Sequence, residues 1–225
     1  MKILIVEDEK ELSDSIAFYL RQEKFNCETV LNYSDAIEKI NLYNYDVVVV
    51  DITLPDGNGL EIIKEMKKIR SNSGIIIISA KQALDDKISG LETGADDYLT
   101  KPFHLSELNA RIKSIIRRRD FDGNNEIVLD ELKIDPERLT VKVNDQALNL
   151  TRKEYDLLLF FLANKNRVLS KESIAEHLWG DNIDLVDSFD FLYSHIKNLR
   201  KKIMEKGGRD YIQTVYGIGY KFSTL

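Results

Sequence analysis

The stretch VVVVDITLPDGNGLE, residues 47–61, joins an unbroken run of four valines to a single acid, Asp51. A run of β-branched residues without polar alternation predicts a strand that is buried on both faces, as in a parallel sheet covered by helices. Pro55, Gly57 and Gly59 then predict a loop. Open α/β sheets bind ligands at the carboxyl ends of their strands, so Asp51 is a candidate site residue, although an acid here is also typical of a helix cap or a solvated turn.

The composition is that of a globular chain. Its 225 residues are 43% hydrophobic and 31% charged, which is ordinary for folded domains and enough for two of them. No apolar run approaches the roughly 18 residues of a membrane-spanning helix, and the first residues, MKILIVEDEK, reach acids too early for a signal peptide. The single cysteine, Cys27, excludes an internal disulfide, and the three scattered histidines give no zinc pattern. We therefore expect a cytoplasmic protein that does not associate with membranes.

Charge is distributed unevenly along the chain. The net charge is −6, but residues 120–190 carry 8 Lys and Arg against 16 Asp and Glu, whereas residues 191–225 carry 7 against 2. A basic end on an acidic domain is typical of a surface that binds a polyanion such as nucleic acid.

Short apolar runs alternate with helical patterns over the first half of the chain. Within the helical patterns the apolar residues recur about every 3.6 positions, as in the stripe of Ile62, Met66 and Ile69. Five βα units predict an α/β fold, a flavodoxin-like (βα)5 domain with the strand order 2-1-3-4-5. The predicted strands are residues 2–6, 27–30, 47–50, 75–78 and 97–100, and the predicted helices are residues 11–23, 34–43, 59–69, 84–94 and 104–119.

Polar side chains follow four of these predicted strands at the point where each strand ends: Glu7 and Asp8, Asp51, Ser79, and Lys101. In the predicted order these strand ends meet at one edge of the sheet, so three acids, a hydroxyl and an ammonium converge there. Carboxylates this close repel one another unless a cation joins them, and Mg²⁺ accepts carboxylate, carbonyl and phosphate oxygens. Each residue alone fits a helix cap or a surface ion pair, but their recurrence at neighbouring strand ends favours a ligand site.

The motifs that hold these residues resemble those of a known family. MKILIVEDEKELSD, DITLPDGNGLE, IIISAK and GADDYLTKPF are similar to the receiver domain of two-component response regulators, over residues 1–118. The resemblance implies that Asp51 accepts a phosphoryl group from a sensor histidine kinase, and a carboxylate can act as such a nucleophile. It also implies a Mg²⁺ site formed by Asp8, Asp51 and the backbone carbonyl of Thr53, with Glu7 acting through water.

The same resemblance implies roles for three more receiver residues. Lys101 would pair with the phosphoryl oxygens, Ser79 would donate a hydrogen bond to the phosphate, and Tyr98 would be the aromatic switch that turns inward behind it. Phosphoryl transfer depends on positioning and on charge neutralisation, which Mg²⁺ and Lys101 would supply. Lys81, two residues beyond Ser79, is a candidate cover over the phosphoryl group.

The second half of the chain predicts a separate α+β domain. The charged, glycine-containing segment 119–125 is expected to be a linker, and residues 126–225 to form the domain. Short alternating strands broken by turn residues predict an antiparallel sheet up to about residue 150. The capping-box pattern TRKE (151–154) then opens a helix. Two further helices, at about 170–180 and 186–204, and a hairpin at 211–224 complete the domain.

The third of these helices carries a candidate DNA-binding face. Its apolar stripe is Leu192, Ile196, Leu199 and Ile203, and the opposite face holds Ser194, Lys197, Asn198 and Lys201, flanked by His195 and Arg200. On an isolated helix this would be an ordinary solvated face. Beside two other helices and a hairpin, it predicts a winged helix-turn-helix whose last helix enters the major groove. There Lys and Arg suit phosphates and guanine, and Asn suits adenine.

LTRKEYDLLLFFL, RVLSKESIAEHLWG, SHIKNLRKKI and YIQTVYGIGYKF resemble the effector domain of the OmpR/PhoB subfamily of response regulators, so the resemblance covers nearly the whole chain. It implies double-stranded promoter DNA as a partner, with RNA polymerase as a further candidate, and adds Trp179, Thr214 and Tyr216 to the candidate DNA contacts. Two positions depart from the family. Tyr216 stands where a wing arginine is common, and Asp190-Phe191 where Arg-Thr is common, so the departures affect which bases are read.

The same subfamily pairs phosphorylated receivers through the fourth helix, the fifth strand and the fifth helix. The resemblance therefore implies a symmetric homodimer, in which each contact occurs twice. Because exposed ion pairs contribute little, an apolar patch is expected to supply more of the affinity than the charges. The matching residues are the pairs Lys87 with Glu107 and Asp97 with Arg111 across the two-fold axis, around Ile88, Leu91 and Ala110.

We therefore predict a phosphorylation-controlled transcriptional regulator that is not an enzyme, apart from its own phosphoryl transfer and dephosphorylation. One alternative is a phosphatase-like hydrolase with Asp51 as nucleophile, but Thr53 stands where its second catalytic acid would be. Another is a DNA-binding regulator that works without phosphorylation and has a decayed receiver. The complete set of strand-end residues, Glu7, Asp8, Asp51, Ser79 and Lys101, disfavours this alternative.

Overall fold

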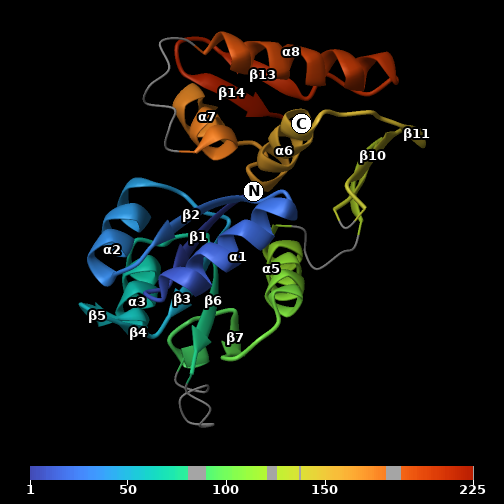
Figure 1. Cartoon of the computed structure of the whole chain (residues 1–225). Helices are drawn as coiled ribbons and strands as arrows, with labels where there is room; N and C mark the ends of the chain where they lie inside the picture. Colours follow the sequence, from blue (N-terminus) through green and yellow to red (C-terminus); the bar gives the residue numbers. More distant parts are fainter. Residues whose placement is uncertain (81–89, 121–125, 137, 181–188, 225) are drawn as a thin grey trace. The chain divides into compact units, whose positions relative to one another are not determined.

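The computed structural model describes residues 1–80, 90–120, 126–136, 138–180 and 189–224 (Figure 1). The chain divides into two compact units, Met1–Arg119 and Asp120–Leu225. Among the described residues, no helix has both the length and the apolar character needed to cross a membrane.

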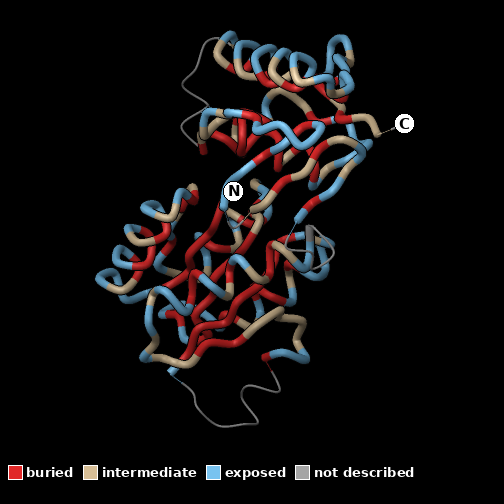
Figure 2. The backbone as a smooth tube through the Cα atoms, turned by 90° about the vertical axis from the view of Figure 1, so that its right-hand side faces the viewer, coloured by how far each residue is buried: buried red, intermediate tan, exposed pale blue. Residues whose placement is uncertain are grey.

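The first unit is built on a five-stranded parallel sheet. Its strands are β1 (Lys2–Val6), β2 (Asn26–Val30), β3 (Val47–Asp51), β6 (Gly74–Ser79) and β7 (Asp97–Thr100). Their order is β2-β1-β3-β6-β7, which confirms the predicted flavodoxin-like order. Every residue of β1, β3 and β6 is buried, as the valine run predicts, and Figure 2 shows these strands in red.

Helices cover both faces of this sheet (Figure 1). Helices α2 (Tyr33–Leu42) and α3 (Gly59–Lys68) pack together on one face, and α1 (Lys10–Gln22) and α5 (Leu105–Asp120) lie on the other. The helix expected over 84–94 falls largely outside the described residues.

The loop after β3 contains a short antiparallel hairpin that the sequence analysis did not predict. It is formed by β4 (Thr53–Leu54) and β5 (Gly57–Asn58). This hairpin positions the residues that follow Asp51.

The second unit begins with the predicted antiparallel sheet. Its strands are β8 (Ile127–Leu129), β9 (Leu132–Asp135), β10 (Thr140–Val143) and β11 (Gln146–Ala147), in the order β11-β10-β9-β8.

Three helices and a second sheet complete this unit. The helices are α6 (Arg152–Ala163), α7 (Lys171–Trp179) and α8 (Asp190–Glu205), and the sheet has the order β12-β14-β13, from β12 (Val168–Ser170), β14 (Gly219–Phe222) and β13 (Ile212–Val215). The capping box at Thr151 and Glu154 forms as predicted. The hairpin is also confirmed, but the sequence analysis did not predict β12 as its third strand.

Candidate functional site

The acidic residues at the ends of β1 and β3 form one cluster. Glu7 is fully buried, the Asp51 side chain is nearly so, and Asp8 is exposed. One carboxylate oxygen from each of the three lies within 4.8 Å of the others. Hard oxygen ligands with one exposed side are suited to a metal ion that keeps part of its water shell. The cluster could therefore hold a divalent cation.

Lys101 joins this acidic cluster from the loop after β7. Its Nζ lies 2.6 Å from Asp51 Oδ2 and 2.7 Å from Glu7 Oε2. Burial raises the pKa of Glu7, and the ion pair with Lys101 only partly offsets this. Burial alone would lower the pKa of Lys101, but its hydrogen bonds to Asp51 and Glu7 outweigh that effect and raise the pKa. The Lys101 ammonium is therefore positively charged. It lies where it could neutralise the charge of an anionic group bound to Asp51.

The loop after Asp51 is held by hydrogen bonds to the Asp51 side chain and to the backbone of Ile52. The Thr53 N–H donates a hydrogen bond of 3.0 Å to Asp51 Oδ1, and the Gly59 N–H donates one of 2.9 Å to the carbonyl of Ile52. A Cβ on Gly59 would lie 2.0 Å from the carbonyl oxygen of Asp51, closer than any side chain allows. The sequence predicted Gly59 as a loop residue at the start of a helix, but it did not reveal the close approach to Asp51 that requires glycine where α3 begins.

Ser79 and Tyr98 lie on strands next to Asp51. Ser79 ends β6, which pairs with β3, and it is buried at the same edge of the sheet. The Tyr98 ring is buried in the hydrophobic cluster that also contains Val50 and Ile77. In this structure the candidate switch residue is therefore turned inward. Lys81, the candidate cover, lies outside the described residues.

Helix α8 has the two faces that the sequence predicts. The apolar stripe is buried, and Ser194, Lys197, Asn198 and Lys201 are exposed. Two other candidate DNA contacts are packed among aromatic rings instead. His195 lies beside Trp179, with ring centroids 5.6 Å apart, and Trp179 also meets Phe191 edge-on at 4.6 Å.

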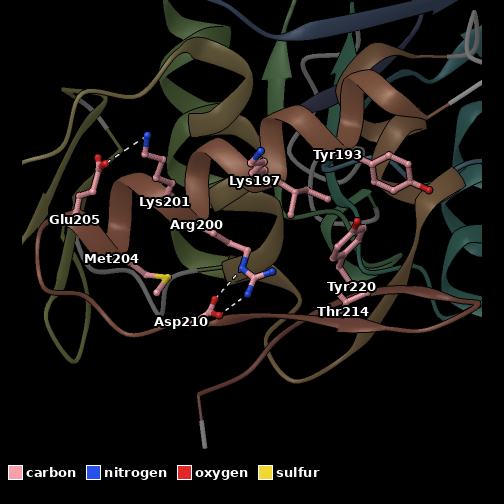
Figure 3. Close-up of a pocket in the computed structure, with 10 residues that line it drawn as sticks. Tyr193, Lys197, Arg200, Lys201, Met204, Glu205, Asp210, Thr214 and Tyr220 are labelled. Atoms are coloured by element: carbon pink, nitrogen blue, oxygen red, sulfur yellow. Dashed lines mark hydrogen bonds and ion pairs between the residues drawn. The ribbon is translucent and has the colours of Figure 1, made fainter.

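A groove of about 450 Å³ runs between α8 and the β13–β14 hairpin (Figure 3). Arg200 points into it, but its guanidinium is held by Asp210, with Nε 2.9 Å from Oδ1 and a second contact between Nη2 and Oδ2. This pair was not expected from the sequence. At the tip of the hairpin Tyr216 is 92% exposed and Ile218 is also exposed, around Gly217 at a φ of +77°.

The candidate dimer face is charged, but its ion pairs form within one chain. Arg111 Nη1 lies 2.8 Å from Asp97 Oδ2, and its Nη2 lies 2.8 Å from Glu107 Oε1. These hydrogen bonds raise the pKa of Arg111. Leu91 is 45% exposed and Ala110 is also exposed. Lys87 and Ile88, which were expected at this face, lie outside the described residues.

Comparison with known proteins places both units in described families. Residues 3–113 match the response regulator receiver domain, and residues 145–222 match the C-terminal domain of transcriptional regulatory proteins. The chain is 39% identical over 219 residues to the response regulator ArlR of Staphylococcus aureus, covering 97% of this chain and 98% of ArlR.

Two solved structures are also similar. The receiver domain of Francisella response regulator 1452 is 34% identical, with a TM-score of 0.51, over 52% of this chain and 97% of that one. A streptococcal protein, described as one of a family of redox sensors that evolved from two-component response regulators, is 27% identical, with a TM-score of 0.50, over 98% of both chains.

A parallel-sheet receiver with an acidic cluster, followed by a winged helix, defines a response regulator. This chain belongs to that family, in its OmpR/PhoB branch, and is a phosphorylation-controlled transcription regulator of a two-component system. Its receiver domain implies a phosphodonor kinase and its effector domain implies DNA as partners.

Proposed function

We propose that Asp51 is the phosphoacceptor and that a sensor histidine kinase is the donor. The observation that supports this most strongly is the contact of Asp51 Oδ2 with Lys101, 2.6 Å away, beside two further acids at the sheet edge. In the transfer, a carboxylate oxygen of Asp51 forms a bond to phosphorus as the bond from phosphorus to the kinase histidine breaks. The electron pair of the broken bond remains on the imidazole.

Mg²⁺ is the proposed cofactor, held by Asp8, Asp51 and the Thr53 carbonyl, with Glu7 acting through water. When bound, it would offset the negative charge of the phosphoryl oxygens. The close approach of the three carboxylate oxygens supports this assignment. Lys101 supplies a second positive charge beside Asp51.

Two residues are proposed to report phosphorylation to the rest of the receiver. Ser79, at the end of the neighbouring strand, donates a hydrogen bond from its hydroxyl to the phosphoryl group. Tyr98 is proposed to be the aromatic switch, whose ring lies inward behind the phosphoryl group once Ser79 has bonded to it. The position of Ser79 at the end of β6, next to β3, supports its role, and Tyr98 already lies inward in this structure.

We propose that the phosphorylated receiver forms a symmetric dimer through Leu91, Asp97, Glu107, Ala110 and Arg111, together with Lys87 and Ile88. The effector domain then binds promoter DNA, with α8 in the major groove and with RNA polymerase as a further partner.

The proposed domains are residues 1–118 and 126–225, joined by a linker at 119–125. Because its target is DNA, the proposed location is the cytoplasm. The protein is proposed not to be an enzyme, apart from its own phosphoryl transfer and dephosphorylation.

The proposed DNA contacts divide between helix and hairpin. Exposed groups on α8 supply hydrogen-bond donors and acceptors for base edges and phosphates, and the hairpin tip reaches toward the adjacent minor groove. The residues are Ser194, His195, Lys197, Asn198, Arg200 and Lys201 on α8, with Trp179 beside it and Thr214 and Tyr216 on the hairpin.

Mass spectrometry after incubation with acetyl phosphate and Mg²⁺ tests the acceptor. The wild type should gain one phosphoryl group, which hydroxylamine removes, and Asp51→Asn should gain none. Asp56→Asn is the matched control, because Asp56 lies in the same loop and accepts hydrogen bonds from Tyr33 and Ser34 at the start of α2. An adduct retained in Asp51→Asn would show that another acid is the acceptor. Sustained release of phosphate would instead indicate a hydrolase.

A further inference from the structure

The groove between α8 and the β13–β14 hairpin contains an acid where a DNA-binding surface would be expected to be basic. Asp210 lies in the connection between α8 and β13 and faces the groove together with Lys197, Arg200 and Lys201 (Figure 3). DNA phosphates attract cations and are repelled by carboxylates, so an acid here opposes DNA binding unless it has another role.

Asp210 is held in a fixed place by its neighbours in sequence. The backbone N–H of Arg209 donates a hydrogen bond of 2.5 Å to Glu131 Oε1 on the β8–β9 turn. On the other side, Tyr211 is buried and its ring stacks on Phe222 at 5.0 Å. The carboxylate between these two anchors is therefore presented to Arg200 by a rigid connection.

The cations of the groove differ in how they are paired. Arg200 makes a two-point contact with Asp210, and this contact raises the pKa of Arg200. Lys201 has only a distant ion pair with Glu205, at 3.6 Å. Lys197 is exposed and makes no ion pair with any residue that the structure describes. The guanidinium, which is the best phosphate ligand of the three because it binds two oxygens at once, is therefore the one already engaged by an anion.

We propose that Asp210 is an affinity-limiting residue of the DNA-binding face, an internal anion that occupies Arg200 and that DNA phosphate must displace to gain this arginine. The inference rests on the proposed role of α8 as the DNA-binding helix. It follows that Arg200 contributes little to the attraction of DNA in general. Non-specific binding consists almost entirely of phosphate contacts. The Arg200–Asp210 pair should therefore weaken non-specific binding more than specific binding, and so increase selectivity.

The exposure of the pair makes it suitable for a mutational test. The Arg200 and Asp210 side chains are 34% and 38% exposed, so neutralising the acid leaves no buried, unpaired charge. We therefore expect Asp210→Asn to fold normally. Asp210→Ser serves as a second variant with no amide to bond the guanidinium.

The experiment measures binding of the full chain to a short duplex DNA of random sequence over a range of salt concentrations. Asp210→Asn should bind roughly two- to fivefold more tightly at low salt, with a slope of log K against log salt more negative by about 0.9, the value for one additional phosphate contact. Arg200→Ala should weaken binding in the wild type by no more than the repulsion from the unpaired Asp210, but should cancel the gain in the Asp210→Asn background. This non-additivity distinguishes competition for Arg200 from a general change in charge.

Asp145→Asn is the matched control. Asp145 is also an exposed acid of the effector unit, and it pairs with Lys133 at 2.7 Å, away from the groove. It should leave the salt slope unchanged. If the Asp210 variants bind with unchanged or lower affinity, Asp210 does not limit binding and the proposal is wrong. A gain that persists in the double variant also overturns it.

Lys197→Ala separates this inference from the proposed role of α8. If that variant loses about one unit of salt slope while Asp210→Asn gains none, α8 binds DNA and only the inference about Asp210 fails. If Lys197→Ala leaves the slope unchanged, the DNA-binding face lies elsewhere and both ideas fail.

Discussion

The acidic cluster of the receiver and the groove of the effector domain are both charged, but they differ in burial. In the receiver, Glu7 and Asp51 are buried at strand ends and share Lys101. In the effector domain, Arg200 and Asp210 meet on an exposed surface. Buried charges must be paired, so the fold fixes their partners, whereas exposed charges can exchange partners at little cost. The first arrangement suits chemistry at a fixed point, and the second suits a surface whose ion pairs change when a charged partner binds.

The largest predicted effect concerns the backbone beneath the acidic cluster. Gly59→Ala places a Cβ 2.0 Å from the Asp51 carbonyl, and because the neighbour is backbone it cannot simply rotate away. We expect a loss of roughly 1–3 kcal/mol in the free energy of unfolding of the receiver, and slower phosphorylation by acetyl phosphate. Denaturation followed by circular dichroism measures the first effect.

Gly217→Ala is the control for Gly59→Ala. Gly217 has a φ of +77°, but a Cβ there has nothing within 4 Å. It should cost only about 1 kcal/mol, confined to the effector domain, because its penalty is conformational rather than a clash. Equal losses in the two variants would show that the loop after β3 adapts more easily than its close contact implies.

The second prediction tests a partly buried ion pair in the effector domain itself. Glu154, in the first turn of α6, binds Lys202 of α8 at 2.7 Å. Burial alone would raise the pKa of Glu154, but the hydrogen bonds from Lys202 and Thr151 outweigh it and lower the pKa. Glu154→Gln should lower stability by roughly 1–3 kcal/mol near neutral pH. Trp179, the single tryptophan, reports this unfolding by its fluorescence.

The pH dependence of that difference has a definite sign. A carboxylate whose pKa is lowered by folding stabilises the protein above its ordinary pKa of 4.5, and this contribution disappears as pH falls through the lower, folded-state pKa. The gap between wild type and Glu154→Gln should therefore be constant above about pH 5 and close below it. Glu205→Gln, which removes the exposed partner of Lys201, should show no such gap. A gap that stays open in acid would mean that the Glu154 charge is not its source.

Much of this difference between the two regions can be predicted from the sequence. The valine run fixes a buried parallel strand, and the topology then brings Glu7, Asp51 and Lys101 to one edge. The partner of Arg200 was not predicted, and Arg111 was expected to pair with Asp97 across a two-fold axis, whereas it pairs with Asp97 within one chain. An exposed cation on a helix has several acids within reach, and sequence spacing does not choose among them. Residues that the strand order brings together can therefore be predicted from the sequence, whereas ion pairs between exposed side chains cannot.

The same reasoning explains the missed elements of structure. Strand β12 and the β4–β5 hairpin are only three and two residues long per strand, too short for an alternating pattern to be recognised. The close approach of Gly59 to Asp51 depends on the three-dimensional path of the loop, which a glycine in the sequence does not reveal.

The third prediction concerns dimerisation of the phosphorylated receiver. Because Arg111 already pairs with Asp97 and Glu107 within one chain, pairing across a two-fold axis would exchange partners rather than add ion pairs. Arg111→Ala should then weaken the dimer little, by about 0–1 kcal/mol, whereas Leu91→Ala should weaken it more. Sedimentation with a phosphoryl mimic measures both. A larger loss with Arg111→Ala than with Leu91→Ala would show that charge, not apolar area, holds the dimer.

The fourth prediction concerns the exposed hairpin tip. Tyr216→Arg adds a cation to a segment that has none between Tyr211 and Tyr220. It should tighten DNA binding broadly, steepen the salt slope by at most about one unit, and add a preference for flanking A·T pairs. Asn198→Ala is the contrasting variant, since it should change the preferred base at one position by about 1–3 kcal/mol. Salt titration on duplexes with randomised flanks tests this, and an unchanged slope would mean that the tip does not reach the minor groove.

The smallest effect is expected at Cys27, another buried titratable group of the receiver. One similar structure belongs to a protein described as a redox sensor, so the question is whether this thiol could serve the same purpose. Cys27 lies on β2, is 4% exposed, and burial raises its pKa to about 12. The thiolate is the reactive form, so at neutral pH almost none is present. Arg21 and the N-terminal ammonium favour the thiolate of Cys27, but burial outweighs both of them. We expect iodoacetamide to label Cys27 in denaturant but not in the native protein, and peroxide to leave phosphorylation of the wild type and of Cys27→Ser equally unchanged. Rapid labelling of the native chain, or a peroxide effect that Cys27→Ser abolishes, would make the receiver core a redox sensor as well as a phosphoacceptor.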